Sequence, residues 1–257
     1  MRNCLGAWRR VMSSTWVYAL KDYSYPFDLR RFDNANTYPG WFAISSDSGD
    51  RAETMKFEGH FRQHALDAIE PWLEVVYWKI YNQPLARNKT TRAIAKRLLS
   101  EQASPRLLWD TCSSFVENPT RQSFEAFRKL FIGSNSIAVA ATFPAFLRPE
   151  IFPMVDRRVA RWVASHMEDH NVADPIGIQL VRPVTPVLEK KQSVLTIQDY
   201  PFYERWIQWC QSTSLKLTRQ TSQNWRARDV EMAVFTAWGK GSRTRKLTMY
   251  LDPLPAV

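Results

Sequence analysis

The sequence predicts an all-α protein that is mostly helical, with minor β content near its N- and C-termini. Apolar side chains recur every three to four residues along most of the chain from residue 60 onward, as on the buried face of a helix. The chain has only 8 glycines but 11 tryptophans, which suits helices packed through large side chains better than a turn-rich β fold. With 257 residues, 45% of them hydrophobic, it can form a packed core in one or two domains.

The composition of the first 59 residues predicts an N-terminal irregular or helical segment that packs on a helical region spanning 60–257. Residues 22–59 are rich in Asp, Ser, Asn, Gly and Tyr and lack sustained periodicity, so we expect an irregular excursion there. A short strand is expected within it at 41–44, where Trp, Phe, Ala and Ile follow one another.

Helices are expected throughout the second region. One begins near residue 60, and Pro71 opens the next, because a proline is tolerated in the first helical turn. Further helices are expected, in chain order, over 90–102, 105–117, 119–131, 134–147, 156–169, 201–212 and 226–238. A Pro- and Val-rich link covers 175–186, and a last short strand is expected at 247–251.

The charge balance and the cysteines narrow the class of protein. Lys and Arg outnumber Asp and Glu by 35 to 25, a formal charge of +10. Such an excess favours a polyanionic partner, nucleic acid above all, although a merely soluble basic protein has the same balance. The three cysteines are scattered, and neither a CxxC motif nor a Cys/His cluster indicates a metal. They are typical of reduced thiols in the cytoplasm.

The N-terminal segment does not have the pattern of a secretory signal. Arg9 and Arg10 stand where such a signal needs an unbroken apolar stretch. No apolar run approaches the length of a membrane span. We therefore expect a cytoplasmic, monomeric protein without a membrane partner.

A glycine turn between two expected helices suits contact with a phosphate. In Ile132-Gly133-Ser134-Asn135-Ser136, the glycine allows one helix to reverse into the next and lets the backbone approach a phosphate closely. The N–H groups at the start of the following helix would point at that phosphate. Ser134 and Ser136 can cap this helix or donate to phosphate oxygens. A single glycine is also a common helix end.

An aspartate stands at the start of the second expected helix after this glycine. Pro149 and Pro153 keep the preceding connection extended and deliver Asp156 to the start of the helix expected over 156–169. Aspartate is among the commonest N-cap residues, so a capping role alone also explains its position. A fixed carboxylate can in addition stabilise positive charge on a sugar as an N-glycosidic bond breaks, and can orient or deprotonate water.

Together, the glycine turn and the aspartate about twenty residues later resemble the helix-hairpin-helix and Gly/Pro-Asp core of the HhH-GPD DNA glycosylases. The resemblance covers roughly 60–240 as architecture and 130–165 as motif. It implies a two-lobed helical fold with a central cleft and a hairpin that grips the DNA backbone. A target base would flip from double-stranded DNA into the cleft, where Asp156 promotes its release. No cofactor is implied.

Bifunctional members of that family use a hairpin lysine to attack the sugar. Here the corresponding position falls on Asn135 or Ser136, and neither can form a Schiff base. The interval to Asp156 is slightly longer than usual, and the hairpin lacks the family's usual second glycine. The resemblance therefore implies a monofunctional DNA N-glycosylase, which excises the base by hydrolysis and leaves an abasic site.

The expected contacts with the DNA backbone come from the hairpin, from the helix after the aspartate and from the basic C-terminal region. Residues 211–250 contain eight Lys and Arg against two Asp and Glu, although a solvated basic face explains any single one of these cations equally well. The expected backbone contacts are Gly133, Ser134, Asn135, Ser136, Arg157, Arg243, Arg245 and Lys246.

Two segments are candidates for the base pocket. Residues 74–79 mix aromatic side chains with a lysine on an expected helix, a pattern that core packing also explains. Residues 225–231 resemble the terminal helix of the archaeal 8-oxoguanine glycosylase branch, where that helix adjoins the pocket. The candidate pocket residues are Tyr77, Trp78, Lys79, Trp225, Arg226 and Asp229.

The sequence leaves the excised base open between two classes. The resemblance to the 8-oxoguanine glycosylase branch favours oxidised purines. Hypermodified phage bases such as glucosylated hydroxymethylcytosine follow from the polar and aromatic residues of 22–59, which suit a hydroxyl-rich ligand; the enzyme would then act in antiviral defence. Two alternative functions fit the same sequence: a non-enzymatic helix-hairpin-helix DNA-binding module with Asp156 only as a cap, and a helical protein-interaction subunit with an acidic partner.

Overall fold

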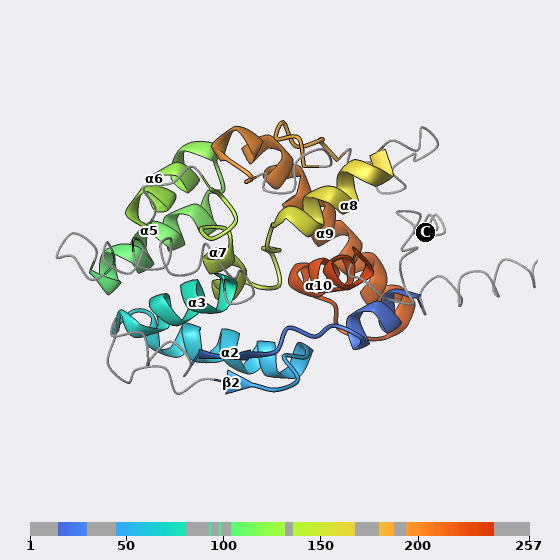
Figure 1. The fold of residues 1–257 in the computed structure, drawn as a ribbon, viewed down its shortest axis with the longest axis horizontal. Helices are drawn as coiled ribbons and strands as arrows, with labels where there is room; N and C mark the ends of the chain where they lie inside the picture. The colour runs from blue at the N-terminus through green and yellow to red at the C-terminus, as the bar shows by residue number, and fades with distance from the viewer. Residues whose placement is uncertain are drawn as a thin grey trace, which may run out of the picture. The chain divides into compact units, whose positions relative to one another are not determined.

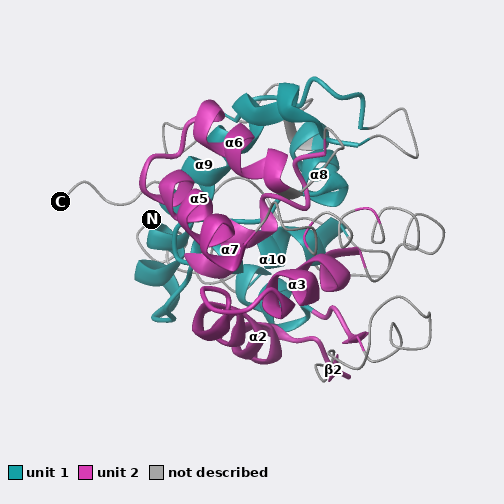
Figure 2. Cartoon of the chain, turned by 90° about the vertical axis from the view of Figure 1, so that its left-hand side faces the viewer, with its two compact units in different colours: residues 1–23, 149–257 teal, residues 24–148 magenta. Residues whose placement is uncertain are grey.

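The computed structural model is mostly helical and carries a two-stranded sheet, which confirms the all-α prediction (Figure 1). The chain divides into two compact units, unit 1 of residues 1–23 and 149–257, and unit 2 of residues 24–148 (Figure 2). Unit 2 groups residues 24–59 with the helices that follow, whereas the sequence predicts a division at residue 59. The structure describes residues 15–29, 45–80, 93, 98, 104–131, 136–167, 180–187 and 194–238.

Unit 2 combines two short antiparallel strands with a set of helices. Strand β1 (Phe27–Asp28) pairs with β2 (Ser45–Ser46), so that Phe27 lies opposite Ser46. The strands expected at 41–44 and 247–251 lie outside the described residues. The helices are α2 (Arg51–His64), α3 (Glu70–Ile80), α5 (Pro105–Glu117), α6 (Arg121–Phe131) and α7 (Thr142–Leu147).

Helix α2 begins at Arg51, so the expectation of irregular structure through residue 59 is wrong for its last nine residues. The side chain of Asp50 accepts a hydrogen bond of 2.9 Å from the Glu53 N–H and caps the helix. Because polar residues share the buried face with apolar ones, the first turns show no apolar periodicity. That face consists of Thr54, Phe57, Glu58 and Phe61.

Helix α7 is shorter than the expected span of 134–147, because it begins only at Thr142. The N–H groups of Thr142 and Phe143 donate to carbonyl oxygens three residues back, at 3.1 Å and 3.3 Å. Such bonds are typical of tight turns. Residues 138–141 are therefore turns that lead into a helix whose six residues are all buried.

Helices α2, α3 and α7 pack through aromatic rings in the core of unit 2. The ring of Trp72 lies 5.0 Å from that of Phe61 and 5.1 Å from that of Phe143. Its Nε1 donates a hydrogen bond of 2.7 Å to the carbonyl oxygen of Ala65, which satisfies the polar end of the buried indole.

Unit 1 is built around tryptophans on α8 (Arg157–Met167) and α9 (Tyr200–Thr221). The rings of Trp206 and Trp209 stack at 5.3 Å with 13° between their planes, and Trp162 of α8 lies 5.8 Å from Trp209. A short 3-10 helix, η2 (Ile197–Asp199), precedes α9, and α10 (Ala227–Trp238) packs against both α8 and α9.

Helix α9 runs to Thr221, whereas the sequence predicts an end at residue 212. Its inner face there buries Thr213, Ser214 and Lys216, which interrupt the apolar pattern. Although α9 has 22 residues, neither it nor any other described helix is long and apolar enough to cross a membrane.

Candidate active site

Asp156 occupies the N-cap of α8. Its Oδ1 atom accepts hydrogen bonds from the N–H groups of Arg158 at 2.7 Å and Val159 at 2.9 Å. Its backbone carbonyl accepts the first helical bond, from Ala160 at 3.0 Å. The N-terminal end of the helix dipole also favours a negative charge at this position. Asp156 therefore has the capping role that its sequence position predicts.

The cap uses only one carboxylate oxygen of Asp156. Oδ2 has no hydrogen-bond partner among the described residues, and the side chain is only half-buried. A carboxylate held through Oδ1 keeps Oδ2 in a fixed position, where it can face a developing positive charge or accept a proton from water. Capping and catalysis are thus compatible in this one residue.

The chain leading to Asp156, which we call the anchored segment (residues 149–155), is held through its backbone. At its start, the carbonyl oxygens of Pro149 and Glu150 accept hydrogen bonds from the N–H groups of Arg228 at 3.0 Å and Ala227 at 3.3 Å. Both donors belong to the first turn of α10, whose N–H groups have no partner within the helix. The first N–H groups of α10 and the first carbonyl oxygens of the anchored segment are therefore hydrogen-bond partners of each other.

Helix α9 supplies three side-chain donors to the same segment. These bonds run from Gln211 Nε2 to the Ile151 carbonyl at 3.1 Å, from the Tyr203 hydroxyl to that of Pro153 at 3.4 Å, and from Trp206 Nε1 to that of Met154 at 3.0 Å. Residues 152–155 are buried, so each carbonyl needs such a partner. Together, the donors of α9 and α10 fix the backbone that presents Asp156.

Two exposed arginines follow the aspartate. Arg157, an expected DNA contact, is exposed on the first turn of α8. The guanidinium carbon of Arg158 lies 4.4 Å from the centre of the Phe235 ring of α10, a cation–π contact that orients this side chain. Two cations thus directly follow the candidate catalytic carboxylate along the chain, which suits a polyanionic substrate.

The candidate pocket residues at the start of α10 are engaged in local hydrogen bonds. Asp229 is fully buried and accepts hydrogen bonds from the Arg226 N–H at 3.0 Å and from Arg226 Nη2 at 2.8 Å. Trp225 is buried, and its Nε1 donates to the Thr221 hydroxyl at 2.9 Å. These contacts give all three residues a structural role in starting α10.

The candidate pocket residues of α3 lie in the core of unit 2. Tyr77 and Trp78 are buried, and Lys79 is half-buried. The Trp78 ring lies 5.0 Å from that of Tyr25 and 5.3 Å from that of Phe146. These contacts are those of the core packing that also explains the sequence pattern.

Most of the residues expected to contact the DNA backbone lie outside the described residues. This holds for Gly133, Ser134 and Asn135 of the hairpin and for Arg243, Arg245 and Lys246. Ser136 is described and half-buried. Helix α6 ends at Phe131 and α7 begins only at Thr142, so the helix expected to follow the glycine directly is not formed over 136–141.

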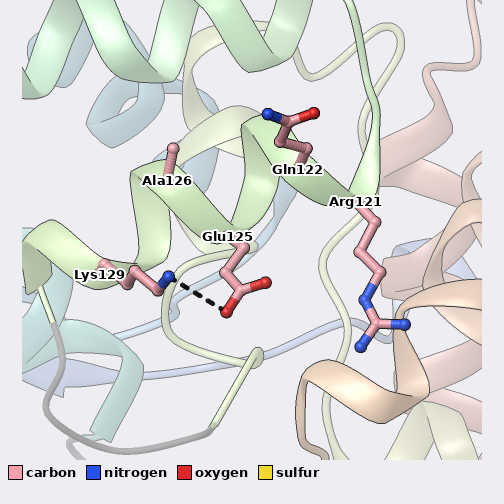
Figure 3. Close-up of a pocket in the computed structure, with 5 residues that line it drawn as sticks. All are labelled: Arg121, Gln122, Glu125, Ala126 and Lys129. Carbon is pink, nitrogen blue, oxygen red and sulfur yellow. Dashed lines mark ion pairs between the residues drawn. The ribbon is translucent and has the colours of Figure 1, made fainter.

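A charged pocket of about 390 Å³ lies on α6 (Figure 3). Lys129 Nζ pairs with Glu125 Oε1 at 3.5 Å, as the dashed line in Figure 3 shows. None of the residues expected to contact DNA or the base lines this pocket. Its lining residues are Arg121, Gln122, Glu125, Ala126 and Lys129.

A histidine–carboxyl pair between α2 and α3 was not predicted from the sequence. His60 Nε2 lies 3.0 Å from Glu74 Oε2, and the His64 ring is 4.8 Å from that of His60. Burial, and secondarily the charge of Glu70, raise the pKa of Glu74 to about 8, while burial and then His64 lower the pKa of His60. Both shifts favour the neutral form of each group, and in that form the carboxyl donates to the imidazole. No local pattern connects residues 14 positions apart on two helices.

The described residues contain no group of three or more His, Cys, Asp and Glu side chains that could hold a metal ion. Cys112 and Cys210 are buried free thiols, and Cys4 lies outside the described residues.

No protein-family model, curated protein or solved structure matches this chain. The assignment of function therefore depends on the residues and their geometry.

Proposed function

We propose that this protein is a monofunctional DNA glycosylase, which flips a damaged or modified base out of double-stranded DNA and hydrolyses its N-glycosidic bond. The protein acts as a cytoplasmic monomer and requires no cofactor. Its formal charge of +10 supports a polyanionic substrate. Asp156 is the catalytic residue.

The observation that carries this proposal is that the two carboxylate oxygens of Asp156 differ in their hydrogen bonding. Oδ1 is committed to the N–H groups of Arg158 and Val159, whereas Oδ2 has no partner among the described residues. As the N-glycosidic bond breaks, the sugar gains oxocarbenium character, and a pre-positioned carboxylate lowers the energy of that state. Oδ2 orients the attacking water and takes its proton.

The anchored segment supports this role, because catalysis by a fixed charge requires that the charge does not relax away. Hydrogen bonds from Trp206 and Tyr203 hold the two carbonyls just before the aspartate. Burial of the segment also requires these hydrogen bonds, and the rigid backbone that they produce is what a catalytic carboxylate needs.

The substrate is an oxidised purine or a hypermodified phage base such as glucosylated hydroxymethylcytosine. The two options differ in biological role, since the first serves DNA repair and the second antiviral defence. Both leave an abasic site, and the same assay separates them.

The test is a single-turnover assay of base release with wild-type protein and the Asp156→Asn variant. The substrates are an 8-oxoguanine duplex, glucosylated phage DNA and the matched unmodified duplexes, with released base identified by mass spectrometry. We expect release from one modified substrate by the wild type and a loss of 100-fold or more, roughly, in the variant, the range seen for single electrostatic groups. An unaltered rate in the variant would falsify the assignment of Asp156.

One observation favours a second function. The two backbone hydrogen bonds to Oδ1 are sufficient reason for an aspartate at this position, so Asp156 fits a non-enzymatic helix-hairpin-helix DNA-binding module as well. Such a module would bind duplex DNA with a steep salt dependence but release no base from any substrate. A helical protein-interaction subunit would do neither.

A further inference from the structure

A row of two arginines and two aromatic residues begins next to the candidate catalytic carboxylate in unit 1. The guanidinium carbon of Arg158 lies 4.4 Å from the centre of the Phe235 ring, and that ring lies 6.1 Å from the ring of Tyr23. The guanidinium carbon of Arg228 in turn lies 5.9 Å from the centre of the Tyr23 ring. We call these four residues the arginine–aromatic row. Its outer member, Arg158, donates its backbone N–H to Asp156 Oδ1.

The inner end of the arginine–aromatic row is fixed by a buried ion pair. Arg228 and Glu231 are both buried, and Arg228 Nη1 pairs with the Glu231 carboxylate within one turn of α10. Arg228 Nη2 also donates a hydrogen bond of 3.5 Å to the hydroxyl of Tyr23, which is buried as well. Since Tyr23 meets Phe235 edge to face, the Phe235 ring packs against a residue that α10 itself holds in place.

The outer end of the row is an arginine that has an aromatic partner but no ionic one. Arg158 is exposed and forms no ion pair among the described residues, and Asp156 forms none there either. Yet the carboxylate lies next to this arginine, because Oδ1 is only 2.7 Å from the backbone nitrogen of Arg158. The long arginine side chain can therefore reach either the carboxylate or the Phe235 ring, and in the structure it lies on the ring.

The two contacts open to Arg158 are of similar strength. An ion pair between exposed side chains contributes little because water screens it, and a cation–π contact at an exposed site is of the same order. The ring of Phe235 is already held in place, so the contact with the ring requires no further ordering of the aromatic partner. Removal of the ring would therefore shift Arg158 toward Asp156. A guanidinium paired with Oδ2 would neutralise the charge that is to stabilise the oxocarbenium-like state.

We propose that Phe235 is a positioning residue, which holds the Arg158 guanidinium on its ring and so keeps this cation from pairing with Asp156 Oδ2. This inference rests on the proposed glycosylase function, because it concerns the carboxylate that acts there. The negative charge of Oδ2 then remains available to the sugar and to the attacking water. Helix α10 supports Asp156 in two ways, since its first N–H groups hold the anchored segment and its last turn holds the neighbouring cation.

The experiment compares Phe235→Leu, which removes the ring, with the matched variant Phe235→Tyr, which retains it. Phe235→Leu should slow single-turnover base release by about two- to fivefold, the population shift that follows from the loss of one exposed cation–π contact. Phe235→Tyr should release base at the wild-type rate. Both substitutions are repeated in an Arg158→Met background, from which this cation is absent. There Phe235→Leu should cause no further loss, whereas a merely structural role of Phe235 would slow release in both backgrounds.

A second measurement does not depend on activity. In NMR spectra of the wild type, nuclear Overhauser effects should connect the δ protons of Arg158 with the ring protons of Phe235. In Phe235→Leu, the same δ protons should instead show Overhauser effects to the β protons of Asp156. Phe235→Tyr should retain the wild-type pattern, because its ring still accepts the guanidinium.

The outcomes separate this inference from the function on which it rests. Equal slowing by Phe235→Leu in both backgrounds, with normal base release by the wild type, would refute the positioning role and leave the glycosylase intact. Absence of base release by the wild type, together with the expected change in Overhauser effects, would refute the glycosylase but support the separation of Arg158 from Asp156. Absence of contacts between Arg158 and Asp156 in Phe235→Leu would overturn the inference whatever the rates.

Discussion

The indole Nε1 of Trp206 donates a hydrogen bond of 3.0 Å to the carbonyl oxygen of Met154, two residues before Asp156. Both residues are buried, so the bond satisfies groups that water does not reach. It connects the stacked tryptophans of unit 1 to the backbone that presents the carboxylate. The position of Asp156 thus depends on a side chain of α9 as well as on its own helix.

Trp206→Phe should therefore slow base release out of proportion to its effect on stability. The phenyl ring retains much of the packing, but the Met154 carbonyl loses its donor, at a cost of about 1–3 kcal/mol. We expect the single-turnover rate to fall by about tenfold or more, because small displacements of catalytic groups are costly. Trp209→Phe is the control, since its indole has no hydrogen-bond partner among the described residues. Equal rates in the two variants would show that the bond is only structural.

Substitutions of Asp156 should separate capping from catalysis. Asn and Ser retain an oxygen that accepts from the helix N–H groups, whereas Ala does not, so only Asp156→Ala should lose about 1 kcal/mol of stability. Base release should be lost in all three variants, because none carries a carboxylate. Urea unfolding and single-turnover rates provide the two measurements. A rate that follows stability, high in Asn and Ser and low in Ala, would leave Asp156 as a cap alone.

The helices that the sequence predicts well are those with local signals. The side chain of Ser104 caps α5, and Pro105 stands in its first turn. The side chain of Asp156 caps α8 in the same way as Ser104 caps α5. The start of α2 was missed because Thr54 and Glu58 are buried, and burial of polar groups is decided by tertiary packing.

The catalytic candidate could be found from the sequence, but its support could not. Asp156 is recognisable from the preceding prolines and from its distance to the glycine turn. The donors that hold the anchored segment, Tyr203, Trp206 and Gln211, lie 50 to 60 residues further along the chain. A hydrogen bond from a side chain to a distant carbonyl leaves no periodicity or spacing in either segment.

Product strands should remain unbroken until treated with heat or alkali. Neither Asn135 nor Ser136 offers an amine at the hairpin position where a lyase would need one. Borohydride should accordingly trap no covalent complex between protein and DNA, as judged by denaturing gel. A trapped adduct that disappears on mutation of Lys79 or another lysine would overturn the monofunctional assignment.

Affinity for duplex DNA should fall steeply with salt. If four to six phosphates are neutralised, the slope of log K against log salt should be about −4 to −5. Arg243→Ala and Arg245→Ala should each flatten this slope by about one unit if the residue contacts a phosphate. Arg106→Ala is a control, because Asp110 already pairs with this exposed arginine at 2.9 Å. A flat response in the wild type would favour the protein-interaction alternative.

The substitution Glu74→Gln should raise the free energy of unfolding, relative to wild type, by an amount that grows as the pH rises. The pKa of Glu74, raised to about 8 by burial, means that the folded protein keeps a proton that the unfolded chain releases above pH 4.5 or so. The wild-type free energy of unfolding therefore loses a contribution between these two pH values, whereas the neutral amide loses none. We expect the stability difference, variant minus wild type, to grow by about 2 kcal/mol between pH 6.5 and pH 8.5, because each pH unit below the folded pKa contributes about 1.4 kcal/mol. The lowered pKa of His60 acts in the opposite direction below pH 6.5, and it differs between the two proteins because His60 contacts Glu74, so the comparison is made above that pH. Urea unfolding across this pH range measures the effect, and the substitution of an exposed glutamate, Glu117→Gln, is the control. Parallel stability curves for wild type and Glu74→Gln would mean that Glu74 is ionised in the folded protein.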